Sequence, residues 1–180
     1  MPRTLHSEVI YRGKVFNVRI DQVELAPGKI TKLDIVQHNG AIVMVPVDSE
    51  GNVWFVEQYR HAAGETLLEL PAGTLEAAED PLSSAQRELR EETGMAASRL
   101  IHLGEFYIAP GYSTEYLHVY LAEGLTPAPL PQDEDEMLQI VKVPINQVFQ
   151  WVPEKKIRDA KTLAALLLAK PTLIKMASHS

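Results

Sequence analysis

Three glutamates recur at helical spacing in one charged segment, "GTLEAAEDPLSSAQRELREETGM" (residues 73–95). An aspartate followed by proline is typical of a helix start, and a glycine after "REET" is typical of a helix end. On the expected helix, residues 81–93, Glu88 and Glu92 lie one turn apart, and Glu91 is three residues from Glu88. Three carboxylates should therefore be held together by one rigid element.

Such a carboxylate group needs a cation among its members, because like charges at short range repel. Hard oxygen ligands suit Mg²⁺ or Mn²⁺, and these ions would neutralise a diphosphate and acidify a bound water. Arg87 can also reach Glu91 along the helix. Composition alone therefore leaves open a solvated helix held by Glu–Arg pairs. The stripe of Leu82, Ala85 and Leu89 should face the core.

Strand-like segments lie on both sides of this helix. The early ones are "SEVIYRG", "KVFNVRIDQVEL", "ITKLDIVQ", "AIVMVPV" and "NVWFVEQYR", and the later ones are "LIHLGEFYIA", "EYLHVYLAEGL" and "MLQIVKVP". Two further helices are expected over residues 145–151 and 159–169. Strands that dominate early, with a helix inserted and others at the end, predict an α+β domain with α/β/α layers.

Composition excludes several classes of function. The chain has 180 residues, 46% of them hydrophobic, and a net charge of -7, which argues against binding the nucleic-acid backbone. It has no cysteine, so disulfides and thiolate chemistry are absent. No apolar run is long enough to form a signal core or cross a bilayer, and we expect a cytoplasmic protein without a membrane partner. The six histidines show no ligand spacing, which gives no support for zinc.

The fixed positions of the charged segment resemble the Nudix box. The preceding "VEQYRHAAGETLLELPAG" and the later Pro110 are similar to the ADP-ribose pyrophosphatase branch of that family. The resemblance implies an α/β/α sandwich of the Nudix type over residues 40–180. It also implies a strand-rich extension over residues 1–39, which in this branch commonly exchanges with a partner to form a homodimer and part of the substrate pocket.

The resemblance also assigns roles to individual residues. The implied ligands for two to three Mg²⁺ or Mn²⁺ ions are the carbonyl of Ala72 and the side chains of Glu88, Glu91 and Glu92. The structural positions of the motif are Gly73, Glu79, Arg87 and Gly94, with Glu79 and Arg87 paired to orient loop and helix. The implied substrate contacts are Arg60, Glu69, Pro110 and Glu115.

The general base is expected on a late loop, "QDEDEMLQ", where Glu134 and Glu136 are alternatives and Glu91 is the next candidate. This acidic loop could equally be a solvated turn. In the same way, Glu115 could be an ordinary glutamate on a surface loop.

The resemblance predicts an enzyme that hydrolyses ADP-ribose to AMP and ribose 5-phosphate with Mg²⁺. Hydrolysis of another nucleoside diphosphate sugar is the nearest alternative, because the box specifies diphosphate cleavage and not the leaving group. A non-catalytic ADP-ribose sensor is an alternative of another class, although a pure binder need not keep the glutamates that activate water.

Overall fold

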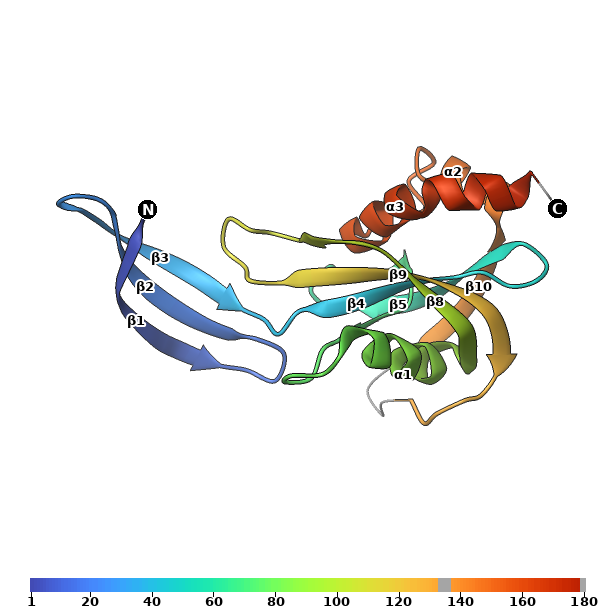
Figure 1. The fold of residues 1–180 in the computed structure, drawn as a ribbon, viewed down its shortest axis with the longest axis horizontal. Coiled ribbons are helices and arrows are strands. Elements are labelled where there is room, and N and C mark those ends of the chain that lie inside the picture. Colours follow the sequence, from blue (N-terminus) through green and yellow to red (C-terminus); the bar gives the residue numbers. More distant parts are fainter. Residues whose placement is uncertain (133–136, 179–180) are drawn as a thin grey trace.

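The computed structural model describes residues 1–132 and 137–178. Within them the strands form three sheets, and helices cover two sides of the central one (Figure 1). This arrangement confirms the predicted α+β class.

The N-terminal sheet projects away from the rest of the molecule (Figure 1). It is an antiparallel meander of β1 (Arg3–Arg12), β2 (Asn17–Ala26) and β3 (Lys29–Gln37). The end of β3 is anchored to a later loop: the N–H of Val36 donates to the carbonyl of Tyr112 at 2.7 Å, and the N–H of Thr114 donates to the carbonyl of Val36 at 3.0 Å.

The central sheet has the order β7 (Ala72–Thr74), β4 (Ala41–Pro46), β9 (Tyr116–Pro127), β8 (Met95–Tyr107). Strands β4 and β9 are parallel, and the other pairs are antiparallel. A further antiparallel sheet has the order β10 (Leu138–Pro144), β5 (Asn52–Arg60), β6 (Glu65–Glu69).

Strand β4 lies at the centre of the core and is buried along its whole length. Alternate side chains of a strand point to opposite faces. Val43 and Val45 accordingly join an apolar cluster with α2 (Ile145–Trp151) and α3 (Ala160–Ala177), whereas Ile42 and Met44 join a second cluster with α1 (Pro81–Thr93). These contacts place α1 on one face of the central sheet and α3 on the other, as Figure 1 shows.

Helix α1 begins and ends where the sequence predicts. The Asp80 carboxylate accepts a hydrogen bond from the N–H of Ser83 at 3.0 Å, and Gly94 ends the helix in the left-handed conformation, with φ of 71°. Ala85 and Leu89 are fully buried as expected, but the prediction that Leu82 is buried is wrong, since its exposure is 47%. Leu82 is in the first turn, beside the edge strand β8, where it borders an open groove with Ala97 and Leu100.

Helix α3 extends to Ala177, beyond the predicted end at Ala169, and Pro171 lies inside it. None of the helices in the described part of the chain combines the length and the apolar character that crossing a membrane requires.

Candidate active site

Arg87 on α1 binds the preceding loop and its own helix at once. Its Nε and Nη2 donate to the two carboxylate oxygens of Glu79, each at 3.1 Å. Its Nη1 donates to Glu88 at 2.8 Å and to Glu91 at 2.9 Å. The planar guanidinium suits this task because its donors form a rigid fork. The structure thus contains the expected Glu79–Arg87 pair and also the Arg87–Glu91 pair.

The charges of this group do not balance. The hydrogen bond from Arg87 holds the pKa of Glu79 below its ordinary value, and the reciprocal bond raises the pKa of Arg87. Arg90 points elsewhere, to the carbonyl of Ala128 at 2.8 Å. Glu79, Glu88 and Glu91 therefore share the Arg87 guanidinium, and three carboxylates carry two more charges than this one cation offsets. Hard oxygen donors with excess negative charge fit a divalent cation.

Strand β7 lies directly against these carboxylates. A Cβ added at Gly73 would be 2.0 Å from Cδ of Glu88, so any larger residue would collide with that side chain. Next to it, the N–H of Ala72 donates to Oε2 of Glu92 at 3.0 Å, and Glu92 is only 3% exposed. The glycine of the motif thus makes room for one predicted metal ligand, and its neighbour orients another.

A second charged group lies at the end of β6. Arg60 makes a two-point contact with Glu69, at 2.8 Å and 2.7 Å, and Glu69 is 1% exposed. Burial by itself would raise the pKa of Glu69, but the hydrogen bond from Arg60 and the charge of Lys161 outweigh it and lower that pKa. The pKa of Arg60 is raised mainly by Glu69 and to a smaller extent by the charge of Glu92. The carboxylates of α1 and the Arg60–Glu69 pair are therefore close enough to interact electrostatically.

Lys161, at the start of α3, was not predicted from the sequence. Its ammonium contacts Glu69 and also lies 3.0 Å from Asp159. It stands 92 residues after Glu69, and no local spacing links the two. Glu69 therefore holds two cations, of which only Arg60 was expected.

The other predicted substrate residues lie on the loop between β8 and β9. Pro110 is in a turn in which the N–H of Ser113 donates to the carbonyl of Ala109 at 2.8 Å. The carbonyl of Glu115 accepts from the N–H of Ile108 at 3.2 Å and closes the loop. These contacts are local, so substrate binding by Pro110 and Glu115 stays a prediction.

Glu134 and Glu136, the predicted base candidates, lie outside the described residues.

The segment that contains these charged residues lies within the match to a known family. The family profile described as "NUDIX domain" matches residues 37–166. This chain belongs to the Nudix family. Its resemblance to the ADP-ribose pyrophosphatase branch is confirmed by a relative of that name from Bacillus subtilis (strain 168), which is 39% identical over 166 residues, covering 91% of this chain and 90% of the relative.

Another relative carries a different name. The methanol dehydrogenase activator of Bacillus methanolicus is 37% identical over 166 residues, with 91% of this chain and 90% of the relative covered. Among solved structures, one described as "Crystal structure of ADP compounds hydrolase" superposes with a TM-score of 0.87 and 25% identity, covering 97% of this chain and 95% of that one. The Nudix fold is confirmed over nearly the whole chain.

Proposed function

We propose that this Nudix hydrolase cleaves ADP-ribose to AMP and ribose 5-phosphate with the help of Mg²⁺. The observation that carries the proposal is the group of Glu88 and Glu91 bound to one guanidinium, with Glu92 on the same helix held by the N–H of Ala72. The relative named ADP-ribose pyrophosphatase supports the choice of substrate.

In the proposed reaction, the oxygen of a water molecule forms a bond to one phosphorus of the diphosphate. The bond from that phosphorus to the bridging oxygen breaks, and the bridging oxygen leaves with the other phosphate. The proton of the attacking water passes to a general base, for which we propose Glu134 or Glu136, with Glu91 as the next candidate. Arg60 would bind the phosphate oxygens or the terminal ribose, since a guanidinium meets phosphate oxygens two at a time. Glu69 holds Arg60 in place for that contact.

The residues that would hold two to three Mg²⁺ or Mn²⁺ ions are Glu88, Glu91, Glu92 and the carbonyl of Ala72. Bound there, divalent ions would neutralise the diphosphate and lower the pKa of a coordinated water. Pro110 and Glu115 would then contact the substrate from the β8–β9 loop.

We also propose that residues 1–39 serve for assembly and residues 40–180 for catalysis, in a cytoplasmic homodimer. The N-terminal sheet and its connections expose large apolar side chains, and an isolated three-stranded sheet with such side chains is a surface for association. The exposed side chains are Leu5, Ile10, Tyr11, Val15, Phe16, Leu25, Ile30 and Leu33.

A panel of substrates with Mg²⁺ tests the activity. ADP-ribose, a GDP-sugar and a UDP-sugar would be incubated in turn, and AMP, GMP, UMP and sugar phosphates would be measured. We expect AMP and ribose 5-phosphate from ADP-ribose to form fastest. Faster release of GMP or UMP would instead indicate another nucleotide sugar, and ADP-ribose binding without turnover would indicate a sensor.

Two matched variants connect the activity to the carboxylates. We expect Glu88→Gln and Glu92→Gln each to lower kcat/KM at least about 100-fold, because even residues that only orient a metal ligand contribute 10–100-fold. Both amides keep the size of the side chain, and the fold should survive. Glu50→Gln, on the exposed turn between β4 and β5, is the control that should keep full activity. Near-full turnover in either test variant would contradict the metal assignment.

A further inference from the structure

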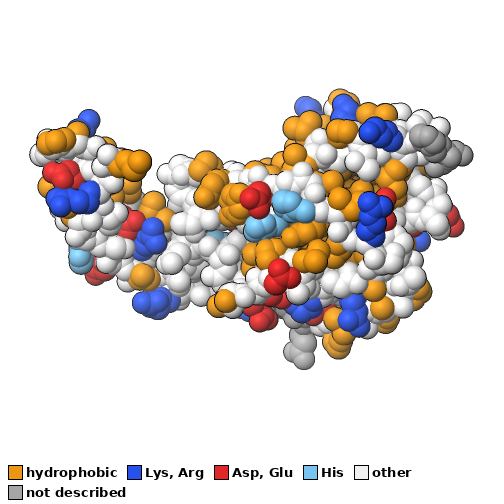
Figure 2. Space-filling model, in the orientation of Figure 1, with side chains coloured by type: hydrophobic (Ala, Val, Ile, Leu, Met, Phe, Trp, Pro, Cys, Tyr) orange, Lys and Arg blue, Asp and Glu red, His pale blue; other side chains and the backbone are white. Residues whose placement is uncertain are grey.

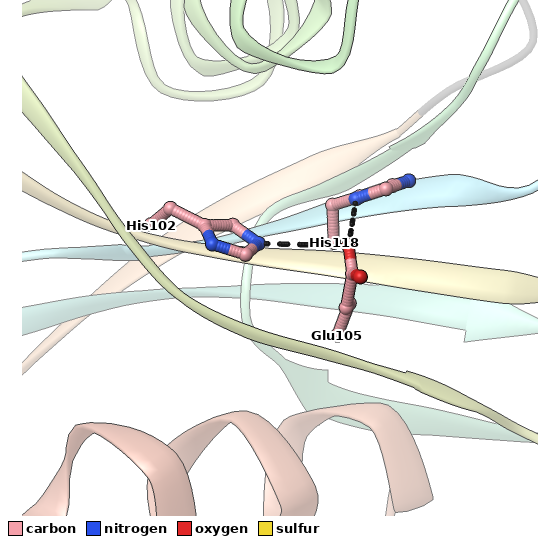
Figure 3. A group of neighbouring side chains, drawn as sticks. All are labelled: His102, Glu105 and His118. Atoms are coloured by element: carbon pink, nitrogen blue, oxygen red, sulfur yellow. Dashed lines mark ion pairs between the residues drawn. The ribbon is translucent and has the colours of Figure 1, made fainter.

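Two histidines and a glutamate that are not part of the Nudix box converge on the surface of the central sheet. His102 and Glu105 come from β8 and His118 from the neighbouring β9, as Figure 3 shows. Nδ1 of His118 lies 3.0 Å from Oε2 of Glu105, and Nε2 of His102 lies 3.8 Å from the same oxygen. One potential ligand atom from each residue lies within 4.8 Å of the other two.

An irregularity of β8 creates this convergence. Residues three apart in a regular strand point to opposite faces, so His102 and Glu105 should not meet. The pairing of β8 with β9 shifts register between His102 and Gly104, where one extra residue of β8 is accommodated. The bulge returns Glu105 to the face of His102 and sets it directly opposite His118.

Close packing on the opposite face accompanies the bulge. A Cβ at Gly104 would be 3.3 Å from a methyl carbon of Leu168 on α3. Because α3 packs this closely, Gly104 belongs to the α3 face of the sheet, while the three polar side chains project from the face on which α1 packs.

A tyrosine ring lies against each of the two histidines. The ring of Tyr116 lies edge-on to His118 with centroids 5.4 Å apart, and the ring of Tyr120 lies 5.4 Å from that of His102. These ring contacts restrict the orientations that the two imidazoles can take.

The group is accessible from solvent. Glu105 and His102 side chains are 43% and 47% exposed, and His118 is partly buried. Figure 2 shows histidine side chains gathered near the middle of this face of the domain, among apolar side chains. An ion could therefore enter without any opening of the fold.

We propose that His102, Glu105 and His118 form a binding site for Zn²⁺, separate from the Nudix box. Neutral imidazole is a preferred ligand of zinc, whereas Mg²⁺ prefers oxygen, so the two sites select different ions. Three protein ligands, two of them histidines and one a carboxylate, leave a fourth position for water. The ion would cross-link the edge strand β8 to β9.

The distances fit this coordination after small side-chain rotations. Zinc bonds to nitrogen and oxygen of about 2.0–2.1 Å in a tetrahedron place neighbouring donors about 3.4 Å apart. The measured separations of 3.0 and 3.8 Å from Glu105 bracket that value. The ordinary alternative is a His118–Glu105 hydrogen bond that binds no ion.

Calorimetric titration with zinc chloride tests the proposal, in the presence of saturating Mg²⁺ to occupy the box. We expect one equivalent of zinc to bind to the wild-type chain and at least about 100-fold weaker binding in His102→Ala, Glu105→Gln and His118→Ala. His6→Ala, an exposed histidine of β1, is the matched control and should bind as the wild type does. Unchanged zinc affinity in the three site variants would overturn the proposal.

Two further measurements keep the test independent of how those variants fold. In the wild-type chain, zinc should shift the imidazole NMR signals of two histidines only, and should raise the unfolding temperature by roughly 5–10 °C at a concentration 100-fold above Kd. The absence of both effects would overturn the site. Zinc binding should also survive in Glu88→Gln, and its loss there would move the ion to the box.

Discussion

Gly73 contributes no side chain to the carboxylate group, yet it controls where Glu88 can lie. A methyl group at this position would come within 2.0 Å of the Glu88 carboxyl carbon. Contacts of that length do not occur, so either the carboxylate or β7 must move. The requirement for glycine at this position therefore has a steric cause.

Gly73→Ala tests this cause. We expect a fall in kcat/KM of at least about 10-fold, a higher Mg²⁺ concentration for half-maximal activity, and about 1–3 kcal/mol lower unfolding free energy from overpacking. The measurements are AMP release across a range of Mg²⁺ concentrations and urea denaturation. Gly111→Ala is the steric control, because no atom lies within 4 Å of its added Cβ, and its stability should change by less than about 0.5 kcal/mol. Unchanged Mg²⁺ dependence in Gly73→Ala would refute the steric argument.

Glutamine substitutions in the late acidic loop test which residue is the general base. If the late acidic loop supplies it, Glu134→Gln or Glu136→Gln should lower kcat about 10²–10⁴-fold with nearly unchanged KM and metal affinity. The reason is that a base acts mainly in the transition state. We expect the larger effect from Glu134, since Glu136 is only two residues before Leu138 in the sequence, where β10 begins. Steady-state kinetics at saturating Mg²⁺ would separate the two, and wild-type kcat in the double variant would move the base to Glu91.

At the scale of elements, Glu69 joins three parts of the fold. It ends β6, its carboxylate binds Arg60 at the end of β5, and it also contacts Lys161 in the first turn of α3. Helix α3 is fixed at the same point, because Thr162 accepts a hydrogen bond from the N–H of Leu70 at 2.8 Å. One buried carboxylate thus orients the predicted substrate arginine and positions a helix.

The lowered pKa of Glu69 predicts a pH-dependent contribution to stability. Since the folded-state pKa is below the ordinary value of 4.5, this contribution is fully present above about pH 4.5 and is lost as pH falls through the folded-state pKa. We expect Glu69→Gln to be about 1–3 kcal/mol less stable than wild type at pH 7, because two cations lose their charged partner. The difference should shrink with acidification below pH 4.5.

Urea denaturation of both proteins between pH 7 and pH 3 measures this change. Glu154→Gln is a suitable control, since its ion pair with Lys156 is about half exposed and such pairs contribute little. A stability difference that is independent of pH would show that packing, and not the charge of Glu69, is responsible.

At the scale of the whole molecule, the N-terminal sheet is set apart from the catalytic part of the chain. Figure 1 shows it extending beyond the end of the central sheet, where backbone hydrogen bonds from Val36 join it to the β8–β9 loop. That loop carries Pro110 and Glu115, the predicted substrate contacts. Assembly through the N-terminal sheet would therefore act close to the proposed pocket.

We expect a homodimer in solution. Two chains of 20.1 kDa give about 40 kDa, and light scattering at micromolar concentration should report this mass. Ile10→Lys, at an exposed apolar position of β1, should weaken the dimer, whereas Lys29→Gln on β3 should leave it intact. A wild-type mass of about 20 kDa would contradict the proposed assembly.

Local features of the chain were predictable from sequence because their causes lie within a few residues. The caps at Asp80 and Gly94 and the i,i+4 pair of Arg87 and Glu91 follow from the geometry of one helix. The family was predictable from the same segment, because many of its residues stand at the fixed spacings of the Nudix box. The α+β class likewise followed from the order of strand-like and helical patterns.

Features that join distant segments were decided only by the tertiary structure. Lys161 reaches Glu69 through the packing of α3 and not through any spacing in the chain, and Leu82 is exposed because α1 begins beside the edge strand. His102 and His118, which show no ligand spacing in the sequence, meet because the pairing of β8 with β9 places them on one face, and a bulge in β8 adds Glu105 to that face. Periodicity describes regular elements, and it cannot predict a register shift between two strands.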